Sequence, residues 1–293
     1  MRILLLGNSG QLGWELERTL APLGELNTCD YPALNLSNPA SFVQVFRDCQ
    51  PDLLVNATAY TAVDRAESEP DLAYAINALA PGVMADEAHH SGAAFIHYST
   101  DYVFDGCKGT PYVETDPPSP LSVYGRTKLA GEQAIQQAGG AYMILRTSWV
   151  YSLRRDSFVS KVLGWARQQE TLKLVDDQVS GPTWAYTLAD VTRQLISLGG
   201  DHLASWFAEH LGLYHLAGSG FCSRYEWGRM ILELDRYKEE QRVRQILSAK
   251  TAEFLTPAKR PLFSALNCDL FNQTFQLQLP DWKVALKLAM EAV

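Results

Sequence analysis

Five short apolar runs alternate with segments of helical periodicity over the first half of the chain, and this alternation constrains the fold more than any other feature. We predict strands at Arg2–Leu6, Leu26–Asp30, Asp52–Thr58, Ala93–Thr100 and Ala141–Thr147, and helices near Leu12–Ala21, Pro39–Cys49, Asp71–His90 and Ser122–Ala138. Pro81 should kink or split the third helix. The βαβ rhythm predicts an α/β fold, a Rossmann-like doubly wound parallel sheet with helices on both faces.

The first predicted strand leads into a glycine-rich turn, Gly7-Asn8-Ser9-Gly10-Gln11-Leu12-Gly13, and a predicted helix follows. Glycines at this spacing allow a tight turn, a close approach of the backbone to a pyrophosphate, and close packing of the helix on the strand. Asp30 ends the next strand, where a carboxylate can accept hydrogen bonds from an adenosine ribose. A plain tight turn is the alternative, but the strand–turn–helix context and Asp30 both favour dinucleotide binding.

The regular rhythm loosens after about Ser148. One more strand is expected at 171–175, helices at 190–198, at 225–233 and from Trp282, and a strand-like run at 213–216. We therefore expect residues 1–150 to form a dinucleotide-binding domain. Residues 151–293 should form mainly a smaller C-terminal substrate-binding lobe, with some segments returning to the Rossmann sheet.

Composition narrows the classes of partner. The chain has 293 residues, a formal net charge of -8 and five cysteines, none in a Cys-x-x-Cys pair. Neither a disulfide framework nor a zinc site is indicated, so we expect a cytoplasmic protein. The acidic balance, without a basic run, argues against nucleic-acid and membrane-surface partners. No apolar stretch approaches the roughly 18 residues that a membrane helix needs.

A second motif supplies candidate catalytic groups. Tyr124 and Lys128 are four residues apart, so both project from one face of the predicted helix. A neighbouring ammonium lowers the pKa of a phenol, which would make Tyr124 a usable general acid at neutral pH. Ser99-Thr100 ends the fourth predicted strand and places a hydroxyl at the carboxyl edge of the sheet, within reach of a substrate carbonyl. A solvated helix face is the alternative for the Tyr–Lys pair alone.

Together these features resemble an extended short-chain dehydrogenase/reductase, and longer segments resemble the dTDP-4-dehydrorhamnose reductase family. The similar segments cover essentially the whole chain: the glycine turn, Asn56–Asp64, Ser99–Gly106, Arg146–Tyr151, Arg260-Pro261 and Leu279–Trp282. Thr-Asp-Tyr-Val-Phe-Asp-Gly, which begins at Thr100, is the most diagnostic. Sugar-nucleotide dehydratases usually carry Asp-Glu after this threonine, whereas here Asp101 is followed by Tyr102, so elimination chemistry lacks its glutamate.

The resemblance implies reduction of the 4-keto group of dTDP-4-dehydro-6-deoxy-L-mannose to dTDP-L-rhamnose, with NADPH or NADH as hydride donor. It implies that Tyr124 protonates the forming alkoxide, that Lys128 holds the ribose and tunes Tyr124, and that Thr100 polarises the ketone. Asp101 and Trp149 match positions that contact the nucleotide-sugar substrate. The expected cofactor-binding set, taken from the turn, Asp30 and the resemblance, comprises Gly7, Gly10, Gln11, Leu12, Gly13, Asp30, Asn35, Leu36, Ala59, Tyr60, Thr61, Tyr98, Tyr124 and Lys128.

Some details depart from the family or stay open. The chain has Leu34-Asn35-Leu36 where relatives often carry an acidic residue near the adenine. The resemblance alone allows for Mg²⁺ and a homodimer, but no carboxylate cluster in the sequence identifies a metal site. Two alternatives remain: a non-catalytic regulatory subunit of the methionine adenosyltransferase type, and a reductase of another nucleotide-linked 4-keto sugar. Intact Thr100, Tyr124 and Lys128 favour an enzyme.

Several aromatic and basic residues have two interpretations. For His97 and His215, each in a strand-like run, we expect core histidines rather than bases. For Trp149, stacking on a base or sugar ring is favoured over packing in the core. Arg154 and Arg155 either meet a diphosphate or belong to a solvated loop.

Overall fold

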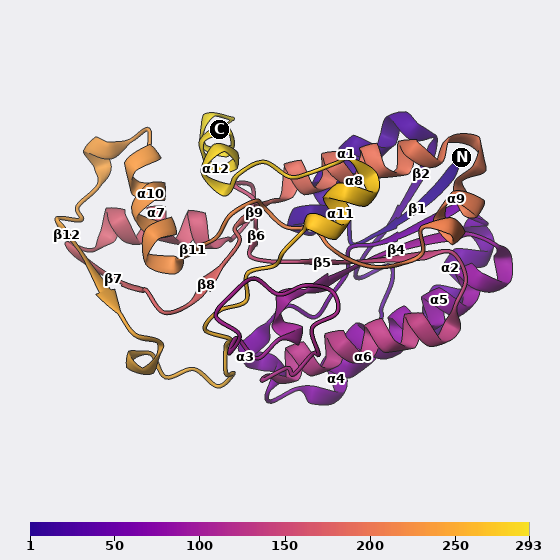
Figure 1. Cartoon of the computed structure of the whole chain (residues 1–293), viewed down its shortest axis with the longest axis horizontal. Helices are drawn as coiled ribbons and strands as arrows, with labels where there is room; N and C mark the ends of the chain where they lie inside the picture. The colour runs from indigo at the N-terminus through magenta and orange to yellow at the C-terminus, as the bar shows by residue number, and fades with distance from the viewer. Residues whose placement is uncertain (293) are drawn as a thin grey trace.

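The structure is a computed structural model that describes residues 1–292. Its central sheet has six strands in the order β10-β5-β4-β3-β1-β2, and every neighbouring pair is parallel (Figure 1). The strands are β1 (Arg2–Leu6), β2 (Glu25–Cys29), β3 (Leu53–Asn56), β4 (Ala94–Thr100), β5 (Tyr142–Thr147) and β10 (Gly212–His215). The predicted Rossmann-like α/β fold is confirmed, and the strand-like run near His215 forms the edge strand beside β5.

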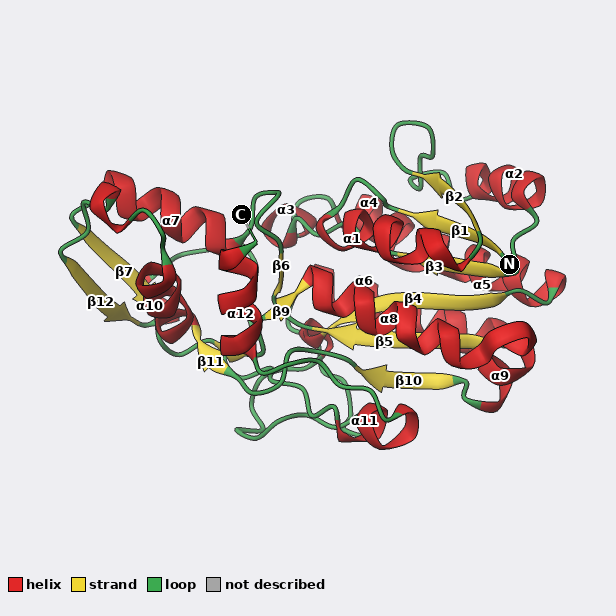
Figure 2. Cartoon of the chain, turned by 90° about the horizontal axis from the view of Figure 1, so that it is seen from above, coloured by secondary structure: helices red, strands yellow, loops and turns green. Residues whose placement is uncertain are grey.

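Helices cover both faces of this sheet (Figures 1 and 2). One face carries α1 (Gln11–Leu20), α8 (Ala185–Gly199), α9 (Leu203–Glu209) and α11 (Asp269–Phe275), and the other carries α2 (Ala40–Cys49), α5 (Ala80–Ser91) and α6 (Val123–Ala138). Each face has its own apolar core, and all seven residues of β4 are buried. A strand covered on both faces is expected to be apolar throughout, as the sequence of the predicted strands indicated.

The predicted third helix is continuous but irregular just before Pro81. It consists of α4 (Pro70–Tyr74), a π-helical turn at Ala75–Leu79, and α5, which follow one another without a break. Proline has no backbone N–H and its ring crowds the carbonyl four residues earlier, which here belongs to Asn77. Gly131 of α6 packs directly against that carbonyl, since a Cβ atom at Gly131 would lie 2.1 Å from its oxygen.

The rest of the chain builds a lobe beside the carboxyl ends of the strands (Figures 1 and 2). Helices α7 (Phe158–Gln168), α10 (Arg224–Leu234) and α12 (Trp282–Glu291) contribute to a separate apolar core. The predicted strand at 171–175 exists as β7 (Thr171–Val175), but it pairs with β12 (Gln245–Ala249) outside the central sheet. The remaining short elements are α3 (Val63–Ala66), β6 (Val150–Tyr151), β8 (Val179–Ser180), β9 (Thr183–Trp184), β11 (Cys222–Ser223) and 3₁₀ turns at Ala21–Leu23, Asp101–Val103, Gly200–His202, Lys238–Glu240 and Thr251–Glu253.

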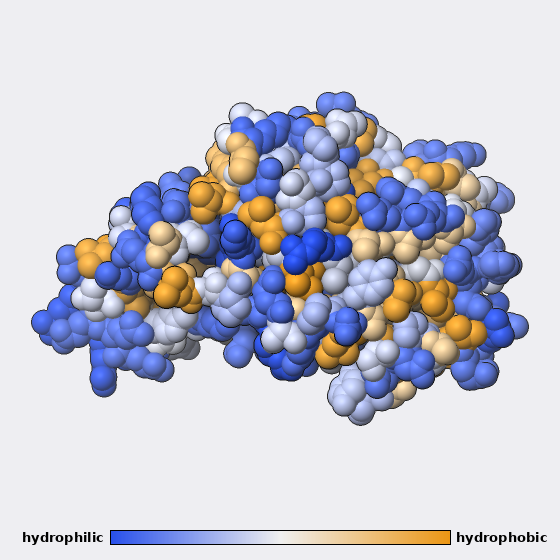
Figure 3. All heavy atoms as spheres, turned by 90° about the horizontal axis from the view of Figure 1, so that it is seen from below, coloured by the Kyte–Doolittle hydropathy of each residue, from blue (hydrophilic) through white to orange (hydrophobic). Residues whose placement is uncertain are grey.

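The surface shown in Figure 3 is mostly hydrophilic, with apolar side chains in small scattered groups. Scattered apolar residues are normal on a folded protein. Over residues 1–292, no helix combines the length and the apolar character that a membrane crossing requires.

Replacing Gly131 with alanine should destabilise the fold. The new Cβ would collide with the Asn77 carbonyl, a backbone atom that cannot swing away, and overpacking of this kind typically costs about 1–3 kcal/mol. Gly164→Ala is the matched control, because Gly164 also lies within a helix but has nothing within 4 Å of the added Cβ. That control should be neutral or stabilising by up to about 1 kcal/mol. Urea unfolding of both variants measures the difference, and equal stabilities would contradict the close packing.

Candidate active site

A cleft of about 810 Å³ lies at the carboxyl ends of the central strands. This is where open α/β sheets bind ligands. Thirteen of the predicted site residues line it: Gly7, Gly10, Gln11, Leu12, Asp30, Ala59, Thr61, Tyr98, Thr100, Asp101, Tyr124, Lys128 and Trp149. Residues far apart in the sequence are therefore brought together as the motifs indicated.

The glycine turn forms one wall of the cleft. Gly7 has a φ of +86°, a conformation that L side chains rarely adopt, and Gly13 lies so close to the turn that a Cβ there would be 1.9 Å from the Gly7 oxygen. Gly10 precedes α1 and has no side chain to cap it, so the first N–H groups of the helix remain available to a ligand. Gln11 Oε1 accepts a hydrogen bond of 2.7 Å from Ser152 N, which ties the turn to the lobe.

Asp30 stands at the end of β2 beside this turn. Its Oδ2 accepts hydrogen bonds from the backbone N–H of Ser9, at 2.9 Å, and from the Ser9 hydroxyl. Its Oδ1 accepts a 2.7 Å hydrogen bond from Tyr31 N. The carboxylate is thus oriented toward the cleft by the turn itself. Ser9 was not among the predicted site residues, although a hydroxyl inside the glycine turn is a recognisable signal.

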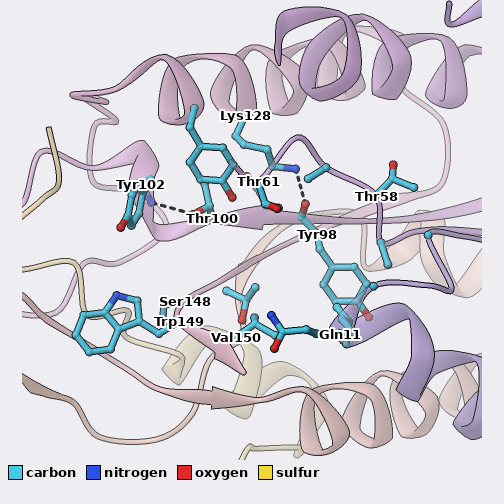
Figure 4. Close-up of a pocket in the computed structure, with 18 of the residues that line it drawn as sticks. Gln11, Thr58, Thr61, Tyr98, Thr100, Tyr102, Lys128, Ser148, Trp149 and Val150 are labelled. Carbon is cyan, nitrogen blue, oxygen red and sulfur yellow. Dashed lines mark hydrogen bonds between the residues drawn. The ribbon is translucent and has the colours of Figure 1, made fainter. Parts of the chain in front are cut away.

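Strand β4 and helix α6 supply the candidate catalytic groups. Thr100 ends β4, and Tyr124 and Lys128 lie one turn apart on α6, whose first turn is capped by the Ser122 hydroxyl through a 3.1 Å bond from Gly125 N. Figure 4 shows Thr100 and Lys128 bordering the same space as Gln11 and Trp149. The three predicted groups therefore lie together at one edge of the sheet.

The pKa of Tyr124 shifts in the direction opposite to the sequence prediction. Burial raises the pKa of this phenol, and a hydrogen bond with Thr100 opposes the shift only in part. Lys128 is not among the groups that shift this pKa. Its Nζ donates to the Tyr98 carbonyl oxygen at 2.7 Å and lies 3.0 Å from His97 Nε2. Burial also lowers the pKa of Lys128 to about 8. The phenol is consequently held as a protonated acid.

Asp101 is buried directly behind Thr100. Its carboxylate accepts hydrogen bonds from Ser264 Oγ at 2.5 Å, Ser180 Oγ at 3.1 Å and Thr100 Oγ1 at 3.2 Å. Burial raises the pKa of Asp101 to about 6, although these hydroxyl donors lower it in turn. The residue thus connects the end of β4 to two segments of the second half of the chain. Neither serine was singled out from the sequence.

Trp149 lines the cleft from the segment after β5, with a φ of +40°. The Arg224 guanidinium lies over its ring, 3.6 Å from the centroid, and Trp227 stacks at 5.6 Å between centroids. Arg224 also lines the cleft, and burial lowers its pKa to about 10. None of the ion pairs formed within residues 1–292 includes Arg224. Arg224 could not be predicted from a local sequence pattern, because only the fold brings α10 to Trp149.

Four predicted cofactor residues do not line the cleft. Gly13 packs behind the turn, and Leu36 is buried in the apolar core beneath α2 and α5. Asn35 is exposed and its Oδ1 accepts hydrogen bonds within its own turn from Ser37. The Tyr60 hydroxyl donates to Glu69. Asn35 and Tyr60 thus bond to polar partners nearby in the sequence, whereas Leu36 packs among apolar side chains.

His97 and His215, which we expected to be core histidines, are both fully buried, and both have polar partners. Of the two arginines, Arg155 lines the cleft, whereas Arg154 stacks on Trp14 with its guanidinium 3.8 Å from the ring centroid. Across residues 1–292, no group of three His, Cys, Asp or Glu side chains is close enough to hold a metal ion.

Comparison with known proteins agrees with this geometry. Residues 1–293 match the family described as RmlD substrate binding domain. A dTDP-4-dehydrorhamnose reductase from Escherichia coli K12 is 44% identical over 292 residues, which cover 98% of this chain and 96% of that protein. The chain belongs to this family.

Two solved structures extend the similarity to three dimensions. A dTDP-4-dehydrorhamnose reductase from Clostridium acetobutylicum has a TM-score of 0.90 and 34% identity, covering 100% of this chain and 99% of the other. One from Bacillus anthracis, solved in complex with NADP, has a TM-score of 0.89 and 31% identity with the same coverage. The family suggested by the sequence motifs is confirmed.

Proposed function

We propose that this protein reduces the 4-keto group of dTDP-4-dehydro-6-deoxy-L-mannose to give dTDP-L-rhamnose, with NADPH or NADH as the hydride donor. The observation that carries the proposal is the convergence of Thr100, Tyr124 and Lys128 beside the glycine turn in one cleft. Membership of a family whose curated members carry this reductase name supports the choice of substrate.

The cofactor supplies the hydride when it is bound. The turn from Gly7 to Leu12 and the N-terminus of α1 would hold its pyrophosphate, because free N–H groups and the helix dipole favour negative charge there. Asp30 would accept hydrogen bonds from the adenosine ribose, and Lys128 would donate one to the nicotinamide ribose.

The chain's own hydroxyl groups would act on the ketone. Thr100 would donate a hydrogen bond to the ketone oxygen, and Tyr124 would transfer its phenolic proton to the alkoxide as that alkoxide forms. The phenol carries its proton throughout the neutral range and therefore has one to give, although burial, by raising its pKa, makes it a weaker acid. In the substrate-free structure the Thr100 hydroxyl donates to Asp101 at 3.2 Å, so this single O–H would turn from Asp101 to the ketone oxygen when the substrate binds.

Trp149 and Arg224 would form the substrate side of the cleft. An aromatic face can stack on a base or a sugar ring, and a guanidinium outside the ion pairs of residues 1–292 suits a diphosphate. We therefore divide the chain into a cofactor domain at 1–150 and a mainly substrate-binding lobe at 151–293, from which α8, α9, β10 and α11 return to the sheet. We further propose that the protein is cytoplasmic and forms a homodimer. Sedimentation analysis would test the dimer.

The direct experiment is to incubate the protein with NADPH and the dTDP-4-keto sugar, which is generated in situ. The decrease in NADPH absorbance then measures consumption of the cofactor. Formation of dTDP-L-rhamnose, identified by chromatography and NMR, is the expected result. Cofactor binding without turnover would instead support a regulatory subunit. Turnover only with another nucleotide sugar would assign the protein to a different reductase.

Replacing Tyr124 with phenylalanine should abolish most turnover while leaving cofactor binding intact. The change removes the proton donor but keeps the ring, and general acid catalysis typically contributes on the order of 100-fold to 10,000-fold. The measurement is kcat together with the NADPH dissociation constant by fluorescence titration. A variant that keeps more than about half of the wild-type kcat would show that another group supplies the proton.

Both cofactors should be used, with kcat/KM values that differ by less than about 1,000-fold. Asp30 suits a free ribose 2′-hydroxyl and repels a 2′-phosphate, but water and salt screen a partly exposed carboxylate. The following Tyr31-Pro32-Ala33-Leu34 supplies no Arg or Lys to bind that phosphate. Asp30→Asn is the matched variant, and it should move the ratio toward NADPH. A larger ratio, or an unchanged one in the variant, would contradict the role of Asp30.

Trp149→Ala should raise the KM for the sugar nucleotide or lower kcat/KM, with a loss of about 1–3 kcal/mol, as for base–aromatic stacking. The NADPH dissociation constant should change by less than about threefold, which is under about 0.7 kcal/mol. Trp165→Ala is the control, because Trp165 is a partly exposed tryptophan on α7 that does not line the cleft. Circular dichroism confirms folding. Normal kinetics in a folded variant, or unfolding as its sole defect, would place Trp149 in the core.

A further inference from the structure

Arg224 brings to the cleft a positive charge that no acidic side chain of residues 1–292 pairs with directly. Within these residues, its guanidinium forms neither a hydrogen bond nor an ion pair. Burial lowers the pKa of Arg224 to about 10, so the group stays charged at neutral pH. A buried charge is normally paired. Because Arg224 lines the cleft, a ligand can supply the missing anion.

The guanidinium lies toward the end of the cleft where the ketone would be reduced. Burial raises the pKa of both Asp101 and Tyr102, and the nearby charge of Arg224 lowers both in turn. Tyr102 and Trp149 border the same end of the cleft (Figure 4). Asp101 does not pair with the guanidinium, because its oxygens accept hydrogen bonds from three hydroxyl groups. The N–H groups of Arg224 therefore remain available on the substrate side.

The backbone of Arg224 is fixed by the start of α10. Arg224 is the first residue of this helix, and a capping box holds the turn that it begins. Ser223 Oγ accepts a 3.1 Å hydrogen bond from Glu226 N, and Glu226 Oε2 accepts one of 2.8 Å from Ser223 N. Arg224 N also donates to the carbonyl of Gln178 at 3.2 Å. The side chain thus starts from a well-defined position.

Three aromatic rings hold the other end of the Arg224 side chain. The guanidinium carbon lies 3.6 Å from the ring centroid of Trp149, 4.8 Å from that of Phe158 and 5.4 Å from that of Trp227. The centroids of Trp149 and Trp227 are 5.6 Å apart. On opposite faces of Trp149, Arg224 and Trp227 would be farther apart than that, so they lie on the same side. A ring of the ligand cannot stack where the guanidinium already lies.

A guanidinium stacked on an aromatic ring keeps its N–H donors in its own plane, where two of them can bind phosphate oxygens together. A side chain that is ordered beforehand also loses less entropy when the ligand binds. We propose that Arg224 binds the diphosphate of the nucleotide sugar, and that Trp149 is a positioning residue that holds the guanidinium for this contact. The identity of the ligand rests on the proposed function. The loss expected for Trp149→Ala would then arise through Arg224.

The first test compares dTDP with thymidine, which lacks the diphosphate. The protein is saturated with NADPH so that dTDP cannot enter the glycine turn, and calorimetry and ligand-observed NMR measure the two affinities. Arg224→Gln should weaken dTDP binding at least about tenfold and change thymidine binding by less than about threefold. Arg229→Gln is the matched control, because Arg229 is exposed on α10 and does not line the cleft. It should change neither affinity by more than about threefold.

Two results would overturn the anion site. Unchanged dTDP binding in folded Arg224→Gln protein would show that its guanidinium does not contact the diphosphate. An equal loss for dTDP and thymidine would show that the residue shapes the cleft without recognising the anion.

The second test is a double-mutant cycle that separates positioning from stacking on the base. If Trp149 acts through Arg224, Trp149→Ala should weaken dTDP binding but change thymidine binding by less than about threefold. In the Arg224→Gln background, Trp149→Ala should weaken dTDP binding by less than about a further twofold. A base stacked on Trp149 would instead weaken thymidine binding as well, and the two losses for dTDP would multiply. Either result would contradict the positioning role.

Conservative variants keep the proposal testable if Trp149→Ala does not fold. Trp149→Phe keeps an aromatic face and should retain dTDP affinity within about threefold, whereas Trp149→Leu fills space without such a face and should lose more. Equal dTDP affinities in these two variants would contradict the contact between the ring and the guanidinium. Circular dichroism and the NADPH dissociation constant show that each variant is folded. None of these measurements needs turnover, so failure of the reductase assay is distinguishable from failure of the anion site.

Discussion

The site depends on buried polar bonds that hold α6 against β4 and β5. Lys128 Nζ bonds to the carbonyl of Tyr98, and Glu132 pairs with Arg146 through two hydrogen bonds of 2.9 and 2.6 Å. The Arg146 and Glu132 side chains are only 4% and 2% exposed. Removing one partner of such a buried pair typically costs about 3–5 kcal/mol, because the other charge is left uncompensated. These bonds fix the position at which Tyr124 meets Thr100.

The same arrangement explains why burial determines the electrostatics of the site. Tyr124, Lys128 and Asp101 all lose contact with water, and in each case burial makes the largest contribution to the shift in pKa. Each shift favours the uncharged form of the side chain. A cleft that keeps its acid protonated suits a reaction in which the developing negative charge appears on the substrate oxygen.

Local patterns in the sequence predicted much of the fold. Strands β1 to β5 and the glycine turn follow from short-range periodicity, and the π-helical turn just before Pro81 is consistent with the backbone chemistry of proline. Long-range pairings were not predictable. Strand β7 pairs with β12 some seventy residues later, and Arg224 reaches Trp149 only because α10 packs beside it. The shift in the Tyr124 pKa was predicted with the wrong sign, since the spacing of two residues says nothing of their burial.

The most direct test of the proposed reduction follows the hydride itself. NADPH that carries deuterium at C4 of the nicotinamide, on the face used by the enzyme, is incubated with the protein and the dTDP-4-keto sugar, and the product is analysed by NMR and mass spectrometry. The account predicts one deuterium per sugar, bound at C4 of the deoxyhexose in dTDP-L-rhamnose. Deuterium at another carbon, or consumption of NADPH without label in the sugar, would contradict it.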